Sequence, residues 1–210
     1  MPKRGYHHGN LRQALVEAAL ALIEEKGPTG FTLSEAAREA GVTPAAVYRH
    51  FEGRDELIIE CALQGHAIFA DLMRYAYESG QPSALASFEA VGRAYLAFAR
   101  RHAGHYMAMF ESGISRNATP ELDRAVAASR AVLDRAADDL SRRIPEGRRP
   151  PPTMFSAHIW AMSHGVVELF ARGGPGANSP FPPEQLLEAG IGIYLRGLGL
   201  IAPDAEPGAS

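Results

Sequence analysis

Histidines are the first residues in this sequence whose type and spacing suggest chemistry. Eight are present, and His102, His105 and His158 could share a zinc ion. There is, however, no HExxH or CxxC motif and no carboxylate at a set spacing from these histidines. We therefore expect neither a metal nor a cofactor.

Residues for covalent or nucleotide-dependent catalysis are equally sparse. Cys61, the single cysteine, has no basic neighbour on its predicted helix face, and no GxSxG motif is present. The pairs Gly190-x-Gly192 and Gly197-x-Gly199 lack the preceding strand that a dinucleotide-binding loop requires. We therefore expect no catalytic residues and no enzyme activity. The remote alternative is an all-α enzyme that uses the His-rich C-terminal half.

The composition is typical of a globular cytoplasmic protein. The chain has 210 residues, of which 46% are hydrophobic and 21% charged. Its longest apolar run, 18–23, is too short for a membrane helix, and its first residues lack the apolar core of a secretory signal. The net charge is −3, yet residues 1–12 carry Lys3, Arg4 and Arg12 without any acid. Such a basic arm could bind nucleic acid or be a solvated tail.

Apolar residues recur at helical spacing along almost the whole chain, and no strand pattern of useful length is present. Two proline clusters, 145–152 and 175–183, indicate loops. The sequence therefore predicts an all-α fold. The predicted helices span 10–26, 32–41, 43–51, 54–77, 83–101, 104–110, 119–143, 153–172 and 183–200.

The second and third predicted helices form a helix-turn-helix pattern. Thr32 to Glu35 make a capping box, Gly41 supplies a left-handed turn, and Pro44 starts the next helix. Val47 and Phe51, four residues apart, should face the core. The outward residues, which include no acid and suit a DNA major groove, are Thr43, Pro44, Ala45, Ala46, Tyr48, Arg49 and His50.

The segments 6–27 (YHHGNLRQALVEAALALIEEKG) and 31–58 (FTLSEAAREAGVTPAAVYRHFEGRDELI) closely resemble the DNA-binding domain of TetR-type transcriptional regulators. One departure is Arg54, where the family usually has Lys; Arg can also hold a phosphate. The resemblance implies that Thr32 and Ser34 touch the DNA backbone. It also implies that Pro44, Ala45 and Tyr48 meet base edges, and that Arg49, His50 and Arg54 meet phosphates. The predicted DNA contacts are Arg4, Thr32, Ser34, Thr43, Pro44, Ala45, Ala46, Tyr48, Arg49, His50 and Arg54. For His50 a half-buried packing role is the alternative.

The C-terminal half resembles the TetR subgroup whose effector domain carries a Trp-His-Gly signature. The matching pieces are 102–110 (HAGHYMAMF) and Trp160, His164 and Gly165 in IWAMSHGVVEL. The resemblance implies a pocket for a small apolar effector, although such residues can also be plain core. The candidate wall residues are Met73, Tyr77, Tyr95, Phe98, Tyr106, Met107, Phe110, Phe155, Trp160 and His164.

The last predicted helix carries two adjacent apolar stripes. One contains Gly190, Ile193 and Gly197, and the other contains Ile191 and Leu198. A helix that is apolar on two faces is buried on both sides, either by a partner chain or inside a monomer. Since TetR-type proteins dimerise through their last two helices, we expect a homodimer.

These expectations combine into one hypothesis with defined domains. Residues 1–53 form a helix-turn-helix DNA-binding domain with a basic arm, 54–202 a helical ligand-binding and dimerisation domain, and 203–210 a flexible tail. The chain is expected to bind double-stranded operator DNA as a repressor that a small effector releases. A ligand-independent regulator or an activator of the same family is the alternative.

Overall fold

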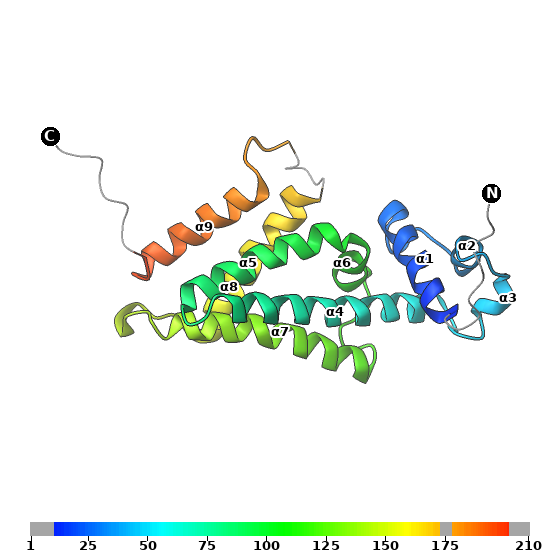
Figure 1. The fold of residues 1–210 in the computed structure, drawn as a ribbon, viewed down its shortest axis with the longest axis horizontal. Coiled ribbons are helices and arrows are strands. Elements are labelled where there is room, and N and C mark those ends of the chain that lie inside the picture. Colours follow the sequence, from blue (N-terminus) through cyan, green and yellow to red (C-terminus); the bar gives the residue numbers. More distant parts are fainter. Residues whose placement is uncertain (1–10, 173–177, 202–210) are drawn as a thin grey trace. The chain divides into compact units, whose positions relative to one another are not determined.

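The computed structural model describes residues 11–172 and 178–201 (Figure 1). Arg4, the rest of the basic arm before Leu11 and the tail 203–210 lie outside the described residues. Every regular element in the described part is helical, as the sequence predicts, and no described helix combines the length and apolar character of a membrane span. The helices are α1 (Leu11–Lys26), α2 (Leu33–Glu39), α3 (Pro44–Val47), α4 (Arg54–Ser79), α5 (Ala84–Arg101), α6 (Ala103–Phe110), α7 (Pro120–Ser141), the 3₁₀ turn η1 (Glu146–Arg148), α8 (Pro152–Val166), the π-helix η2 (Val167–Ala171) and α9 (Pro183–Gly197).

The helices form two compact units that share α4. One unit contains the chain up to Ile68 together with His102–Ala128, and the other contains Phe69–Arg101 together with the chain from Ser129 onward. Helix α4 therefore begins in the first unit and ends in the second.

In the first unit α1 packs against α2 and α6, and α2 packs against α3. Leu15, Ala19 and Ile23 of α1 are fully buried, as their spacing of four predicts. At the end of α2 Gly41 has φ +72°, its amide donates to the Arg38 carbonyl, and the next amide donates to the Ala37 carbonyl. These two bonds make a Schellman motif that stops α2 and sets the direction of α3.

The prediction that the third helix reaches Phe51 is wrong. Regular α3 ends at Val47, and residues 48–50 form turns. The amides of His50 and Phe51 both donate to the Val47 carbonyl, at 2.9 and 3.0 Å. The helical bonding pattern is thus replaced by a tighter turn before Gly53 and α4.

In the second unit α5, α8, η2 and α9 pack together. The predicted continuous helix 153–172 is wrong in one respect: α-helical bonding ends at Val166, directly after the Trp160–Gly165 segment, and a π-helix follows. Helix α9 closes at Gly197, and a second Schellman motif uses Gly199, whose φ is +78°. Sequence periodicity does not distinguish a π-helix from an α-helix, because both place apolar residues at similar spacing.

Candidate nucleic-acid interface and internal cavity

The segment 43–51 presents an acid-free outer surface over a buried base. Val47 and Phe51 are 0% and 1% exposed and anchor the segment in the core of the first unit. Ala46 and His50 are half-buried, so the packing role considered for His50 applies to part of its side chain. The exposed members are Thr43, Pro44, Ala45, Tyr48 and Arg49, with Tyr48 61% exposed. An aromatic ring held open to solvent on this surface is available to a partner.

The start of α2 lies at the edge of this surface and is fixed by the predicted capping box. The Glu35 amide donates to Thr32 Oγ1 at 3.2 Å, and the Thr32 amide donates to Glu35 Oε2 at 2.9 Å. Lys26 Nζ donates to the same carboxylate at 2.9 Å. The bonds from Lys26 and then Thr32 lower the pKa of Glu35 to about 2. Thr32 and Ser34 remain exposed, so both can still reach a phosphate.

Arg54 is partly committed to the protein. Its Nη1 donates to the Thr29 carbonyl at 3.1 Å, and its Nη2 lies 3.6 Å from Asp55. The side chain is 39% exposed. Arg54 therefore holds the turn between α1 and α2, and its Nε is buried without a hydrogen-bond partner among the described residues.

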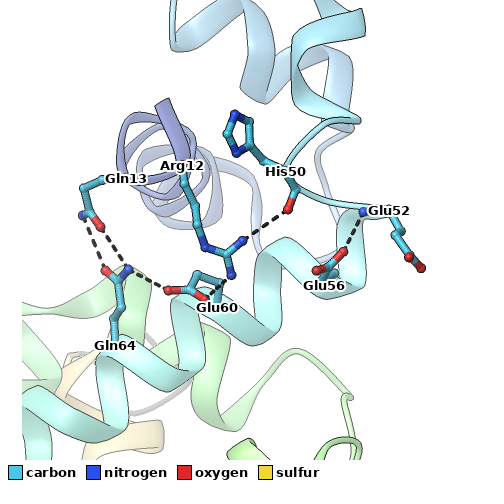
Figure 2. Close-up of polar contacts among 7 residues, drawn as sticks. All are labelled: Arg12, Gln13, His50, Glu52, Glu56, Glu60 and Gln64. Atoms are coloured by element: carbon cyan, nitrogen blue, oxygen red, sulfur yellow. Dashed lines mark hydrogen bonds and ion pairs between the residues drawn. The ribbon is translucent and has the colours of Figure 1, made fainter. Parts of the chain in front are cut away.

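Arg12 is a functional candidate whose tertiary role sequence reasoning missed, since it counted Arg12 only as part of the basic arm. Its guanidinium donates to the His50 carbonyl at 3.2 Å and pairs with Glu60 at 2.5 Å (Figure 2). It also lies 4.6 Å from the centre of the Phe51 ring. The partners are 38 and 48 residues away in sequence, so no local spacing pattern could have indicated them.

The second unit contains a cavity with mostly apolar walls, which opens to solvent beside Arg130 and Asp134. The cavity has a volume of only about 40 Å³, so it is narrow. Its walls come from α5, α7, α8 and α9. The lining includes Phe88, Val91, Tyr95, Leu133, Ile159, Trp160 and Ile191.

Of the ten predicted wall residues, Tyr95 and Trp160 line this cavity. His164 joins them indirectly: its Nδ1 lies 3.0 Å from the Tyr95 hydroxyl, and its ring stacks on Trp160 with centroids 5.5 Å apart. Burial lowers the pKa of His164, which favours a neutral imidazole that can accept a hydrogen bond from the Tyr95 hydroxyl. Tyr95, Trp160 and His164, all predicted wall residues, thus form one cluster in the structure.

The other predicted wall residues lie elsewhere. Met73, Tyr77, Phe98 and Phe155 are buried in the same unit without lining this cavity. Their neighbours explain this: Phe98 packs edge-on against Phe69, Tyr77 donates to Asp139, and Phe155 stacks on Tyr194. The remaining three belong to the first unit and are Tyr106, Met107 and Phe110.

Four polar residues that the sequence did not indicate also line the cavity; Ser163 is one, and the other three form a cluster. Ser156 donates to the Asp134 carboxylate, and Arg130 Nε lies 3.4 Å from the same carboxylate. This cluster joins α7 to α8. The polar groups of this cluster interact with one another, so a ligand in the cavity would mainly contact the apolar walls.

The histidines considered for zinc do not form a metal centre in the described part of the chain, which contains no group of three His, Cys, Asp or Glu residues able to hold an ion. His102 and His105 lie with ring centroids 5.9 Å apart in the first unit. His158, in the second unit, shares a 2.9 Å hydrogen bond with the Tyr194 hydroxyl.

Comparison with known families finds two matches that divide the chain. Residues 15–61 match the model of bacterial regulatory proteins of the tetR family. Residues 88–194, about half of the chain, match the tetracyclin repressor-like C-terminal domain.

Individual proteins agree with these matches. An uncharacterized HTH-type transcriptional regulator from Haemophilus influenzae is 44% identical over 66 residues, which are 31% of this chain and 32% of that protein. The match thus spans about a third of the length of this relative. A solved structure of a protein with unknown function from Rhodococcus sp. RHA1 is 29% identical, with a TM-score of 0.76 over 93% of this chain and 99% of that chain. The structure of AibR in complex with isovaleryl coenzyme A and operator DNA is 18% identical, with a TM-score of 0.67 over 87% of this chain and 97% of that chain.

Proposed function

The chain belongs to the TetR family of bacterial regulatory proteins, and from this premise we propose that it is a homodimeric transcriptional repressor that a small effector releases from operator DNA. The observation that carries the proposal is the exposed, acid-free surface of 43–50 above the buried Val47 and Phe51. This arrangement supports insertion into a major groove, where methyl groups, a phenol and a guanidinium can read bases and hold phosphates. A protein of this function acts in the cytoplasm and is not an enzyme.

The residues proposed to contact DNA fall into two groups, those that meet base edges and those that meet phosphates. Tyr48 and the exposed Pro44 and Ala45 are proposed to meet base edges, since they project from the outer face of the segment. Arg49 and Thr32 are proposed to meet phosphates. Thr43, Ser34, Ala46, His50, Arg54 and Arg4 complete the proposed contact set.

The effector is proposed to occupy the cavity beside Tyr95 and Trp160. AibR, which shares the fold, binds isovaleryl coenzyme A. The apolar walls here support a small apolar group with one polar end directed at the Tyr95–His164 pair. Because the cavity is narrow, binding must widen it, and a ligand that prefers the wider state shifts the equilibrium away from DNA.

Helix α4 is the element proposed to transmit that shift. It begins in the unit that carries the 43–51 segment and ends in the unit that contains the cavity. A functional boundary at Gly53 separates the proposed DNA-binding domain from the proposed effector domain of 54–202.

We also propose that the effector domain belongs to the Trp-His-Gly subgroup. Trp160 and His164 stack with an interplanar angle of 12°, and both approach the Tyr95 ring or hydroxyl. The π-helix begins two residues after Gly165. π-helical turns are frequently found at functional sites.

A homodimer through α8 and α9 is supported by the exposure of apolar side chains. Four of the seven exposed large hydrophobic residues of the described chain lie between the start of α8 and the end of α9. Met154 is in α8, Leu169 in η2, Phe181 just before α9 and Ile193 in α9. In α9 the stripe with Leu187 and Ile191 is buried, whereas Ile193 is 66% exposed. An outward apolar stripe on the same helix supports burial against a second copy.

A footprint on the DNA that flanks the gene tests the proposed function. We expect protection of a near-palindromic site by the wild-type protein, and loss of that protection when Tyr48 and Arg49 are both replaced by Ala. Equal, unprotected binding to any duplex would contradict the proposal.

A further inference from the structure

The guanidinium of Arg12 connects three elements of the first unit. Arg12 lies in the first turn of α1, donates to His50 near the end of the recognition segment 43–51, and pairs with Glu60 of α4 (Figure 2). Its guanidinium also contacts the Phe51 ring.

The contacts with the recognition segment compensate for the early end of α3. Because regular helix stops at Val47, the His50 carbonyl has no partner in a following helical turn. Arg12 Nη1 supplies that partner at 3.2 Å. The same guanidinium lies 4.6 Å from the centre of the buried Phe51 ring, which adds a cation–π contact at the point where the segment enters the core.

The contact with α4 is held by further side chains. Glu60 accepts from Arg12 Nη2 at 2.5 Å and from Gln64 Nε2 at 3.0 Å. Gln64 in turn donates to Gln13 of α1 at 3.0 Å. Arg12 and Gln13 of α1 are therefore joined to Glu60 and Gln64 of α4 by one connected network of hydrogen bonds (Figure 2). This network restricts the side-chain orientations that Arg12 can adopt.

We propose that Arg12 is a positioning residue for DNA recognition: it holds the end of the 43–51 segment against α4, and it raises operator affinity without contacting DNA. The inference rests on the proposed function, because it assumes that 43–51 is the recognition segment. Two terminal donors of Arg12 are used by His50 and Glu60, and its side chain is 45% exposed, so the test must distinguish positioning from direct contact with a phosphate.

Whether Glu60→Gln weakens or strengthens DNA binding distinguishes a positioning role from a purely electrostatic one. Removing an acid near DNA strengthens binding when charge alone matters, because the phosphates repel it. If Glu60 instead holds Arg12 in place, the nearly isosteric Glu60→Gln weakens binding. The salt dependence gives a second criterion, since loss of one phosphate contact lowers the slope of log K against log salt by about one.

The experiment measures the affinity of full-length variants for a duplex selected from a random pool by the wild-type protein. We expect Arg12→Ala and Glu60→Gln each to weaken binding by about 3- to 30-fold, in the range of coupled neighbouring contacts, with the salt slope unchanged. Arg49→Ala serves as the phosphate-contact comparison and lowers the slope. Arg74→Ala, which removes another exposed arginine that is paired with an aspartate, leaves the affinity unchanged.

Amide hydrogen exchange provides a readout that does not depend on DNA. We expect Arg12→Ala and Glu60→Gln to accelerate exchange of the His50 and Phe51 amides by about threefold or more, because the end of the segment opens locally, while amides of α5 are unaffected. Unchanged exchange at these amides, a tighter Glu60→Gln complex, or a reduced salt slope for Arg12→Ala would each overturn the positioning role. If the wild-type protein selects no duplex, the proposed function fails, and the exchange data alone then decide whether Arg12 positions the segment.

Discussion

The Tyr95 hydroxyl lies 3.0 Å from Nδ1 of His164, sixty-nine residues further along the chain. Trp160 stacks on the imidazole and meets the Tyr95 ring edge-on, with centroids 5.7 Å apart. Two of these three side chains line the cavity. The pair therefore supplies a polar point at the edge of a mostly apolar space, fixed in place by an aromatic neighbour.

Tyr95→Phe should lower the free energy of unfolding by about 0.5–1.5 kcal/mol, because the half-buried His164 imidazole loses its hydrogen bond to the Tyr95 hydroxyl. Urea denaturation at pH 7 measures the change. The matched control is Tyr194→Phe, which removes a 2.9 Å bond to the exposed His158 and should cost less. Equal costs for the two variants would show that burial does not strengthen the Tyr95–His164 bond.

DNA binding should distinguish Tyr48 from Arg49. We expect Tyr48→Ala to change base preference by about 1–3 kcal/mol at one position in each half-site, and Arg49→Ala to weaken all sequences alike. Selection of duplexes with each variant, followed by affinity measurements on the selected and scrambled sites, checks both. If Arg49→Ala relaxes preference at a single base, the two roles are reversed.

The operator should contain two half-sites that face the two copies of the recognition segment. A two-fold dimer that reads successive major grooves requires half-sites about one helical turn, roughly 34–36 Å, apart. Inserting five base pairs between the half-sites turns one of them to the opposite side of the duplex, and we expect a large loss of affinity in a gel-shift assay. An insertion of ten base pairs keeps the half-sites on one side of the duplex but moves them about 34 Å further apart, so a rigid dimer should lose affinity for that site as well. Wild-type affinity for either insertion would be inconsistent with a rigid dimer.

Gly197→Leu should dissociate the dimer without unfolding the protomer. An added Cβ at Gly197 meets no atom within 4 Å, so the larger side chain fits a single copy. At a close two-fold contact the same side chain costs about 1–3 kcal/mol for each copy. Sedimentation measures the dissociation. Gly147→Leu, at an equally open glycine in η1, should leave the wild-type mass, whereas a normal dimer for Gly197→Leu would place Gly197 outside the interface.

Stability should fall in mild acid because of His66. This side chain is 5% exposed and meets Phe110 edge-on, and burial lowers its pKa to about 4. The unfolded chain therefore takes up a proton as the pH falls through about 6.5, whereas the folded protein resists it down to about 4. The stability that the neutral imidazole maintains is fully present above pH 6.5 and is lost between these values.

His66→Gln should reduce this acid sensitivity. Between pH 7 and pH 4 we expect the wild-type protein to lose about 2–3 kcal/mol more unfolding free energy than the variant, from a pKa difference of this size. Urea midpoints at both pH values provide the measurement. The same acid-induced loss in both proteins would assign it to other groups, among them His105 and His164, whose pKa values burial also lowers.

The sequence by itself determined the helical elements and the base of the recognition segment. The Thr32–Glu35 capping box and the Gly41 turn are local, because their hydrogen bonds join residues three to five positions apart. The spacing of Val47 and Phe51 likewise identified the buried side of the segment. Local chemistry and helical periodicity are sufficient for features of this kind.

Only the tertiary structure decided which of the candidate side chains meet. Tyr95 reaches His164, and Arg12 reaches His50 and Glu60, across separations that no periodic pattern encodes. Phe98 and Phe155 are aromatic residues at helical spacing, just as Trp160 is, so the sequence does not distinguish them from it. In the structure, however, they pack elsewhere. A helical pattern specifies the face on which a side chain lies; the packing of several helices specifies whether that face meets a cavity, a core or a charged partner.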